Sequence, residues 1–229
     1  HPTTYEFIEQ SLDVLSNKFP LVKAAMIWVT SDLSLWELFA VEEFQGNGRN
    51  AVCSRKLKQE PGKALEAALG LTDAPITFGF GDLEPERLGN VKRNRPNAVA
   101  PLVEDSRFFD KQGLNEFVRE LGMKTPHLYS IGMAHNNCGG FCVKAGQAHY
   151  KRLLQEDPEL YSQHETKQEH FIAGLPEERK GSVGFITVQR GGTKYRLTLR
   201  EFRLWVEAGS PVDVLDYGSC SCFSQLELF

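Results

Sequence analysis

The 229-residue chain lacks several features that would assign it to a class at once. No apolar run approaches the roughly 18 residues of a transmembrane helix, and no secretory signal pattern is visible. Basic residues are not in excess, since 26 Lys and Arg stand against 30 Asp and Glu, which removes the electrostatic argument for general nucleic-acid binding. We therefore expect a cytoplasmic globular protein without membrane contact, formed by one large domain or by one domain with a small appendage.

Cysteine is also scarce, but its five positions are informative. Cys138 and Cys142 form a CxxxC pair, Cys220 and Cys222 form a CxC pair, and Cys53 stands apart. In a reducing compartment, clustered cysteines indicate metal binding or catalysis before disulfide formation. Four thiolates suit an iron–sulfur cluster or a structural zinc, and the spacing does not choose between them because neither pair is a CxxC. A third alternative also stays open, in which the cysteines bind no metal and are small buried apolar residues.

The CxxxC pair lies in an unusual segment, His-Asn-Asn-Cys-Gly-Gly-Phe-Cys-Val-Lys-Ala-Gly at residues 135–146. A helical pattern runs from about Gly140 to Leu154, and a helix starting near Cys138 would place Cys142 one turn later on the same face. His135 and Lys144 are candidate contacts to a bound cofactor. The segment combines metal-ready thiols with glycines that allow close backbone approach, so it predicts a site.

A second candidate site begins at Cys53. Three cations follow the thiol at Arg55, Lys56 and Lys58, where they would stabilise a thiolate and attract an anionic group such as a phosphate. The preceding loop, Gly-Asn-Gly-Arg-Asn at 46–50, is weak evidence for a phosphate cradle because it follows a helix rather than a strand.

Hydrophobic periodicity predicts helices that alternate with a few short strands. Helices are expected at residues 4–18 after a Thr3–Glu6 capping box, and at 33–44, 61–69, 84–94, 111–121, 140–154 and 160–171. Strands are expected at 21–29, 76–80 and 97–103, and a hairpin joins 183–189 to 194–199 before a short helix capped at Thr198 that ends at Gly209.

This alternation predicts an α/β fold with a mostly parallel sheet flanked by helices, followed by a C-terminal β-hairpin and a cysteine-containing tail. The strands are few for this architecture, so we expect that an N-terminal βα unit is missing. The expected division is a nucleotide-binding α/β domain at residues 1–180 and a C-terminal segment at 181–229 that packs on it.

With these pieces in place, the chain resembles the phosphoadenosine phosphosulfate reductase group of the adenine nucleotide α-hydrolase (ATP-pyrophosphatase) superfamily. The matching segments lie in the expected order along the chain, at residues 1–8, 53–61, 79–87 and 135–146. The His-Asn-Asn-Cys-Gly-Gly-x-Cys form is most similar to bacterial and phage members. The Ser-Gly-Gly-x-Asp-Ser loop that grips phosphates in that family does not occur in this sequence, and we expect it upstream of His1.

The resemblance implies an adenine nucleotide at the C-terminal edge of the sheet, either ATP with Mg²⁺ or a phosphosulfate. Carried over by position, Glu84 and Arg87 match a family-like acid–base pair. The phosphate or sulfate would be contacted by Arg55, Lys56 and Lys58. Cys53 would then lie near the substrate, as the thiol that attacks sulfur in a reductase.

The resemblance also implies an iron–sulfur cluster. In family reductases that contain such a cluster, two cysteines near a position like Cys53 act together with a later CxxC. This chain has one cysteine there and a later CxxxC. That departure favours a 4Fe–4S cluster held by Cys138, Cys142, Cys220 and Cys222. The implied activity is reduction of an adenylylated sulfate or adenylylation-dependent sulfur transfer, served by a sulfur-donor or electron-donor protein.

Two alternatives stay open. A DNA- or tRNA-modifying sulfurtransferase subunit would use the hairpin turn at Arg190 and a basic cluster formed by Arg87, Lys92, Arg93 and Arg95, and its nucleic-acid binding would depend on salt. A non-enzymatic module would instead hold structural zinc through the cysteines.

Overall fold

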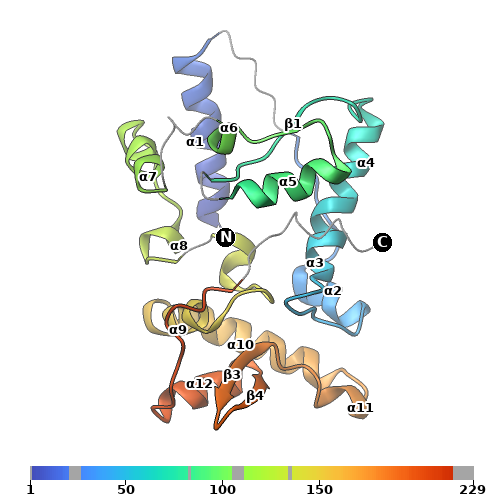
Figure 1. Ribbon diagram of the computed structural model, residues 1–229, viewed down its shortest axis with the longest axis vertical. Helices are drawn as coiled ribbons and strands as arrows, with labels where there is room; N and C mark the ends of the chain where they lie inside the picture. The colour runs from blue at the N-terminus through green and yellow to red at the C-terminus, as the bar shows by residue number, and fades with distance from the viewer. Residues whose placement is uncertain (1, 21–26, 82–83, 105–110, 134–135, 219–229) are drawn as a thin grey trace. The chain divides into compact units, whose positions relative to one another are not determined.

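The computed structural model describes residues 2–20, 27–81, 84–104, 111–133 and 136–218 (Figure 1). The chain folds into two compact units. Among the described residues, unit 1 comprises 2–20, 27–29, 59–81, 84–104 and 111–126, and unit 2 comprises 30–58, 127–133 and 136–218. Segment 181–218 therefore belongs to the same unit as the helices that precede it.

Unit 1 is built around a short βαβ arrangement. Strands β1 (Ile76–Thr77) and β2 (Ala98–Val99) pair in parallel, and helix α5 (Pro85–Asn94) lies between them in sequence. Its small core consists of the buried residues Phe78, Phe80, Leu88, Val91, Ala98 and Ala100. The remaining helices of unit 1 are α1 (Pro2–Lys18), α4 (Glu60–Ala68), α6 (Pro101–Glu104) and α7 (Lys111–Glu120).

Unit 2 contains the larger core and both described cysteines of the CxxxC pair. Strands β3 (Ile186–Arg190) and β4 (Thr193–Leu197) form an antiparallel hairpin, which packs on α9 (Gln147–Glu156) and α12 (Leu199–Glu207) (Figure 1). Helix α10 (Pro158–Ala173) contacts α9, α12 and α2 (Leu35–Val41). The other elements of unit 2 are α3 (Val52–Ser54), most of the π-helical segment η1 (Arg55–Gln59), α8 (His127–Ser130), the 3₁₀ turn η2 (Asn137–Gly140) and α11 (Glu177–Lys180).

Local sequence signals explain where several helices begin. The side chain of Thr198 accepts from the Glu201 N–H and the Glu201 carboxylate accepts from the Thr198 N–H, so the expected capping box of α12 is confirmed. The same reciprocal arrangement at Ser34 and Glu37 starts α2. The Thr3 capping box is wrong, since α1 already begins at Pro2, a residue suited to a first helical turn.

The expected mixed α/β class is confirmed, but a large parallel sheet is not shown, because the described sheets are one two-stranded parallel pair and one hairpin. The expected strand at 97–103 stops at Val99, since α6 starts at Pro101. In the expected strand at 21–29, residues 27–29 have no strand structure and 21–26 lie outside the described residues. No helix in the described part of the chain is long and apolar enough to cross a bilayer.

Candidate functional site

The CxxxC segment forms an irregular turn. Cys138 has φ 53° and ψ 26°, Gly139 has φ 61°, and Gly140 has φ 93°, so three successive residues have positive φ. Glycine tolerates this region, but an L-residue with a Cβ in the left-handed conformation costs about 1–2 kcal/mol. Phe141 is extended and α9 begins only at Gln147. The helix expected at 140–154 is therefore present, but its expected start at Gly140 is wrong, as is the shared helical face of the two cysteines.

Two buried histidines hold this turn from the helices beneath it. The Nε2 of His149 on α9 lies 2.8 Å from the Gly140 carbonyl oxygen, and the Nε2 of His164 on α10 lies 2.8 Å from the Gly139 carbonyl oxygen. A carbonyl only accepts, so each Nε2 must carry the proton. Burial lowers the pKa of His164 from its ordinary value, which keeps this ring neutral.

Tyr150 fixes the second cysteine. Its hydroxyl donates to the Cys142 carbonyl at 2.7 Å and accepts from the Cys142 N–H at 3.0 Å, so one phenol satisfies both backbone groups. The ring is 0% exposed, and burial raises the pKa of Tyr150 well above that of an ordinary tyrosine. The hydroxyl therefore stays protonated and keeps both bonds.

The three described cysteines differ in their surroundings. The Nζ of Lys58 lies 3.9 Å from the Sγ of Cys138, where its charge favours a thiolate. Cys138 and Cys142 are partly exposed. Cys53 is 8% exposed and belongs to the apolar core of unit 2, an environment in which thiols are usually unreactive.

The last described residues of the chain lie against the segment that follows Cys142. Gly218 forms an antiparallel bridge with Ala145, and the Asp216 backbone carbonyl accepts from the Ala148 N–H at 2.8 Å. The Asp216 carboxylate accepts from the Gln147 N–H at 3.1 Å and thereby caps α9. The tail is thus anchored next to the CxxxC turn. Cys220 and Cys222 lie outside the described residues, as does His135.

The other candidate residues are placed as follows. Lys56 approaches Glu42 at 4.0 Å, while Arg55 is exposed. In unit 1, Glu84 and Arg87 form an ion pair, and the Glu84 carboxylate also accepts from the Gly81 N–H at 2.8 Å. The Arg87 guanidinium lies 4.5 Å from the centre of the Phe80 ring, within cation–π range.

The basic cluster on α5 is largely neutralised by acidic neighbours. Lys92 pairs with Glu104 at 2.7 Å, and Arg95 pairs with Glu66 at 2.9 Å. These ion pairs weaken the argument for a nucleic-acid surface on this helix, because the cations already have carboxylate partners.

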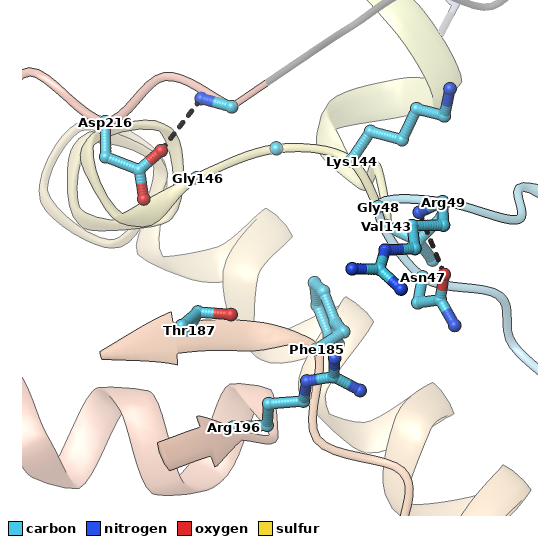
Figure 2. A pocket seen from close by; sticks show the side chains of 12 residues that line it. Asn47, Gly48, Arg49, Val143, Lys144, Gly146, Phe185, Thr187, Arg196 and Asp216 are labelled. Atoms are coloured by element: carbon cyan, nitrogen blue, oxygen red, sulfur yellow. Dashed lines mark hydrogen bonds between the residues drawn. The ribbon is translucent and has the colours of Figure 1, made fainter. Parts of the chain in front are cut away.

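A pocket of about 500 Å³ in unit 2 was not identified from the sequence. Of the residues expected to bind a cofactor, it includes Lys144, which is 5% exposed. Its walls come from the 46–50 loop, the segment after Cys142, the hairpin and the tail (Figure 2). The sequence pointed to two of these walls separately, through the glycine-rich 46–50 loop and the end of the 135–146 segment, but only the fold brings them together with the hairpin and the tail. The lining residues are Asn47, Gly48, Arg49, Val143, Lys144, Ala145, Gly146, Phe185, Thr187, Arg196, Asp216 and Gly218.

Within the described residues, no group of three or more His, Cys, Asp or Glu side chains is arranged to hold a metal ion. Two of the four cysteines expected at a cluster fall in this part of the chain. Comparisons of the sequence and structure with protein-family models, curated proteins and solved structures found no match.

Proposed function

We propose that this protein is a sulfur-chemistry enzyme similar to the phosphoadenosine phosphosulfate reductases, acting with an adenine nucleotide and a thiolate-held iron–sulfur cluster. The observation that carries the proposal is the construction of the Cys138–Cys142 turn. Two buried imidazoles and a buried phenol bond to the backbone of this turn, which is unfavourable at Cys138, and a lysine ammonium lies beside the Cys138 sulfur. Backbone strain of this kind persists when the surroundings enforce it, and it concentrates at functional sites.

The donor set fits an iron–sulfur cluster. Cys138 and Cys142 would supply two thiolates, and Cys220 and Cys222 the other two. Gly218 is bridged to Ala145, and Cys220 and Cys222 follow this anchored end of the described tail by two and four residues. The Lys58 ammonium beside Cys138 would offset part of the negative charge of four thiolates. Such a cluster would supply electrons for reduction or a reactive sulfur for transfer.

In this proposal the protein's own side chains bind and orient the nucleotide. Arg55 and Lys56 of unit 2 provide cations for the phosphate or sulfate oxygens of the nucleotide. Mg²⁺ would accompany a triphosphate. The burial of Cys53 counts against its role as the attacking thiol, because a substrate would meet the partly exposed cysteines of the turn first.

Anaerobic purification tests the cluster. We expect a brown protein that contains iron and acid-labile sulfide in equal amounts, and the loss of both in Cys138→Ser and Cys142→Ser. Cys53→Ser is the matched control and should keep them. Stoichiometric zinc without sulfide would replace this proposal with the structural-zinc module, and protein without bound metal would overturn both.

The reaction class can be separated by product. Incubation with a phosphosulfate nucleotide and a dithiol electron donor yields sulfite if the protein is a reductase. Incubation with ATP and Mg²⁺ releases pyrophosphate if it adenylylates an acceptor. If cluster-loaded protein forms neither product, this result counts against the nucleotide-dependent activity and leaves the cluster in another role.

A further inference from the structure

The unit 2 pocket has features that the cysteine chemistry does not use. We propose that it binds a small molecule through a tetrahedral oxyanion, either a phosphate or a sulfate group. The pocket lies wholly within unit 2, and this inference does not depend on a cluster at the CxxxC turn.

The charge of the lining favours an anion. Among its described residues are three cations, Arg49, Lys144 and Arg196, and one carboxylate, Asp216. The two carboxylate oxygens of Asp216 each accept a backbone N–H, from Gly218 at 3.1 Å and from Gln147 at 3.1 Å. This carboxylate therefore caps the helix and holds the tail, and it forms no described ion pair with Arg196.

Strand alternation explains the position of Arg196. Register pairs Thr187 with Arg196 and Ile186 with Leu197, so successive pairs face opposite sides of the hairpin. Ile186 is buried in the core, which leaves Thr187 and Arg196 on the outer face that lines the pocket. Arg196 forms no ion pair or side-chain hydrogen bond with any residue that the structure describes. Its guanidinium donors therefore remain for a ligand.

The opposite wall is held in shape by an amide. The Oδ1 of Asn47 accepts from the backbone N–H groups of Arg49 and Asn50, both at 2.9 Å, which closes the 46–50 loop around Arg49. Figure 2 shows the Arg49 and Arg196 guanidinium groups approaching from these two walls, with Phe185 between them in the view, while the Lys144 side chain runs away from Arg49. Two guanidinium groups on facing walls suit an oxyanion that offers acceptors on several sides.

The size and the apolar part of the pocket indicate a small ligand. A volume of about 500 Å³ is within the usual range of small-molecule sites, which is about 300–1,000 Å³. Val143 and Phe185 add apolar surface beside the cations, so a nucleotide or an organic sulfate would gain more contact than the inorganic ion.

Calorimetric titration of the intact protein tests the proposal, with inorganic phosphate, sulfate, ADP and uncharged adenosine as probes. We expect binding of the oxyanions and of ADP but not of adenosine, and Kd at least tenfold higher in Arg49→Gln and in Arg196→Gln. Arg190→Gln is the matched control, because it removes the same charge from the same hairpin outside the pocket and should leave Kd unchanged. Tighter binding of ADP than of either inorganic ion assigns the oxyanion to a nucleotide phosphate; preference for sulfate assigns it to a sulfate.

Absence of oxyanion binding would overturn the inference. An equal loss of affinity in the Arg190 and Arg196 variants would also overturn it, because the affinity would then depend on net charge alone. The same titration of Cys142→Ser protein separates the two proposals. Oxyanion binding by this variant shows that the pocket does not need the cluster. Wild-type protein that binds the oxyanion but contains no iron supports the pocket while the cluster fails, and wild-type protein that contains iron but does not bind the oxyanion does the reverse.

Discussion

At the scale of single residues, the contact between Tyr150 and Cys142 makes the sharpest prediction. Tyr150→Phe removes one oxygen and leaves the Cys142 N–H and C=O without that partner. A buried polar group without its hydrogen bond costs about 1–3 kcal/mol, so we expect the free energy of unfolding to fall by about that amount in urea denaturation. Iron content should fall with it, because the cysteine is no longer fixed.

Tyr161→Phe is the control for this prediction. The Tyr161 hydroxyl is also buried and donates to the Leu199 carbonyl at 2.7 Å, away from the cysteine turn. It should lose stability but keep its iron. Equal iron content in the two variants would show that Tyr150 has no positioning role.

His164 makes stability depend on pH. Burial lowers the pKa of the folded residue, and its Nδ1 is buried without a hydrogen-bond partner among the described residues. The unfolded chain takes up this proton near the ordinary pKa of about 6.5, whereas the folded protein does so at lower pH. The unfolded state then binds more protons, so the free energy of unfolding decreases below about pH 6.5 by up to about 1.4 kcal/mol per pH unit.

Denaturation between pH 7.5 and 5 measures this effect. His164→Gln keeps an N–H donor for the Gly139 carbonyl but does not titrate, so its stability should fall less over this interval. The same slope in both proteins would assign the acid sensitivity to other groups.

Residues with distinctive chemistry could be identified from the sequence, but their partners could not. The glycines and paired cysteines indicated a site, and Lys58 and Lys144 lie beside it or beside the adjacent pocket. Tyr150 and His164 gave no signal, because a buried tyrosine or histidine looks the same in sequence whether it supports a loop or fills a core. The positive φ of Cys138 also has no sequence signature, since cysteine rarely adopts it.

At the scale of elements, periodicity predicted most helices and the hairpin, and the errors have local causes. The hydrophobic pattern of α9 extends back to Gly140, but two glycines and a left-handed cysteine prevent helix formation before Gln147. Apolar runs at 76–80 and 97–103 suggested full strands, whereas each paired segment is two residues long. Apolar composition reports burial, and burial does not require strand pairing.

Two glycines in different surroundings, one at the junction of α9 with the tail and one within α5, predict opposite effects of substitution by alanine. A Cβ at Gly146 would overlap the Asp216 carboxylate, so Gly146→Ala must displace the tail and weaken the α9 cap. We expect a loss of about 1–3 kcal/mol in the free energy of unfolding, as for other overpacked sites. Gly89 lies within α5, where an added Cβ would meet no atom within 4 Å, so Gly89→Ala should gain about 0.5–1 kcal/mol.

Thermal and urea denaturation of the two alanine variants check these signs. Stabilisation by Gly146→Ala would mean that the tail does not occupy this position in solution. Destabilisation by Gly89→Ala would contradict the open surroundings of α5.

At the scale of the whole molecule, the two units differ in how much apolar surface they bury. The described core of unit 2 contains 20 buried residues, whereas that of unit 1 contains six. Hydrophobic burial is the main favourable term in folding, and small cores give marginal stability. The units are therefore expected to open with different free energies.

Hydrogen exchange followed by mass spectrometry, at increasing concentrations of urea, measures this difference. Amides of α5 in unit 1 should exchange through an opening of lower free energy than amides of α9 and α10 in unit 2. Leu153→Ala removes a fully buried side chain from unit 2 and should lower the opening free energy of α9 and α10 by about 2–5 kcal/mol. If α5 responds by the same amount, the chain unfolds as one cooperative body, and the small core of unit 1 must draw its stability from unit 2.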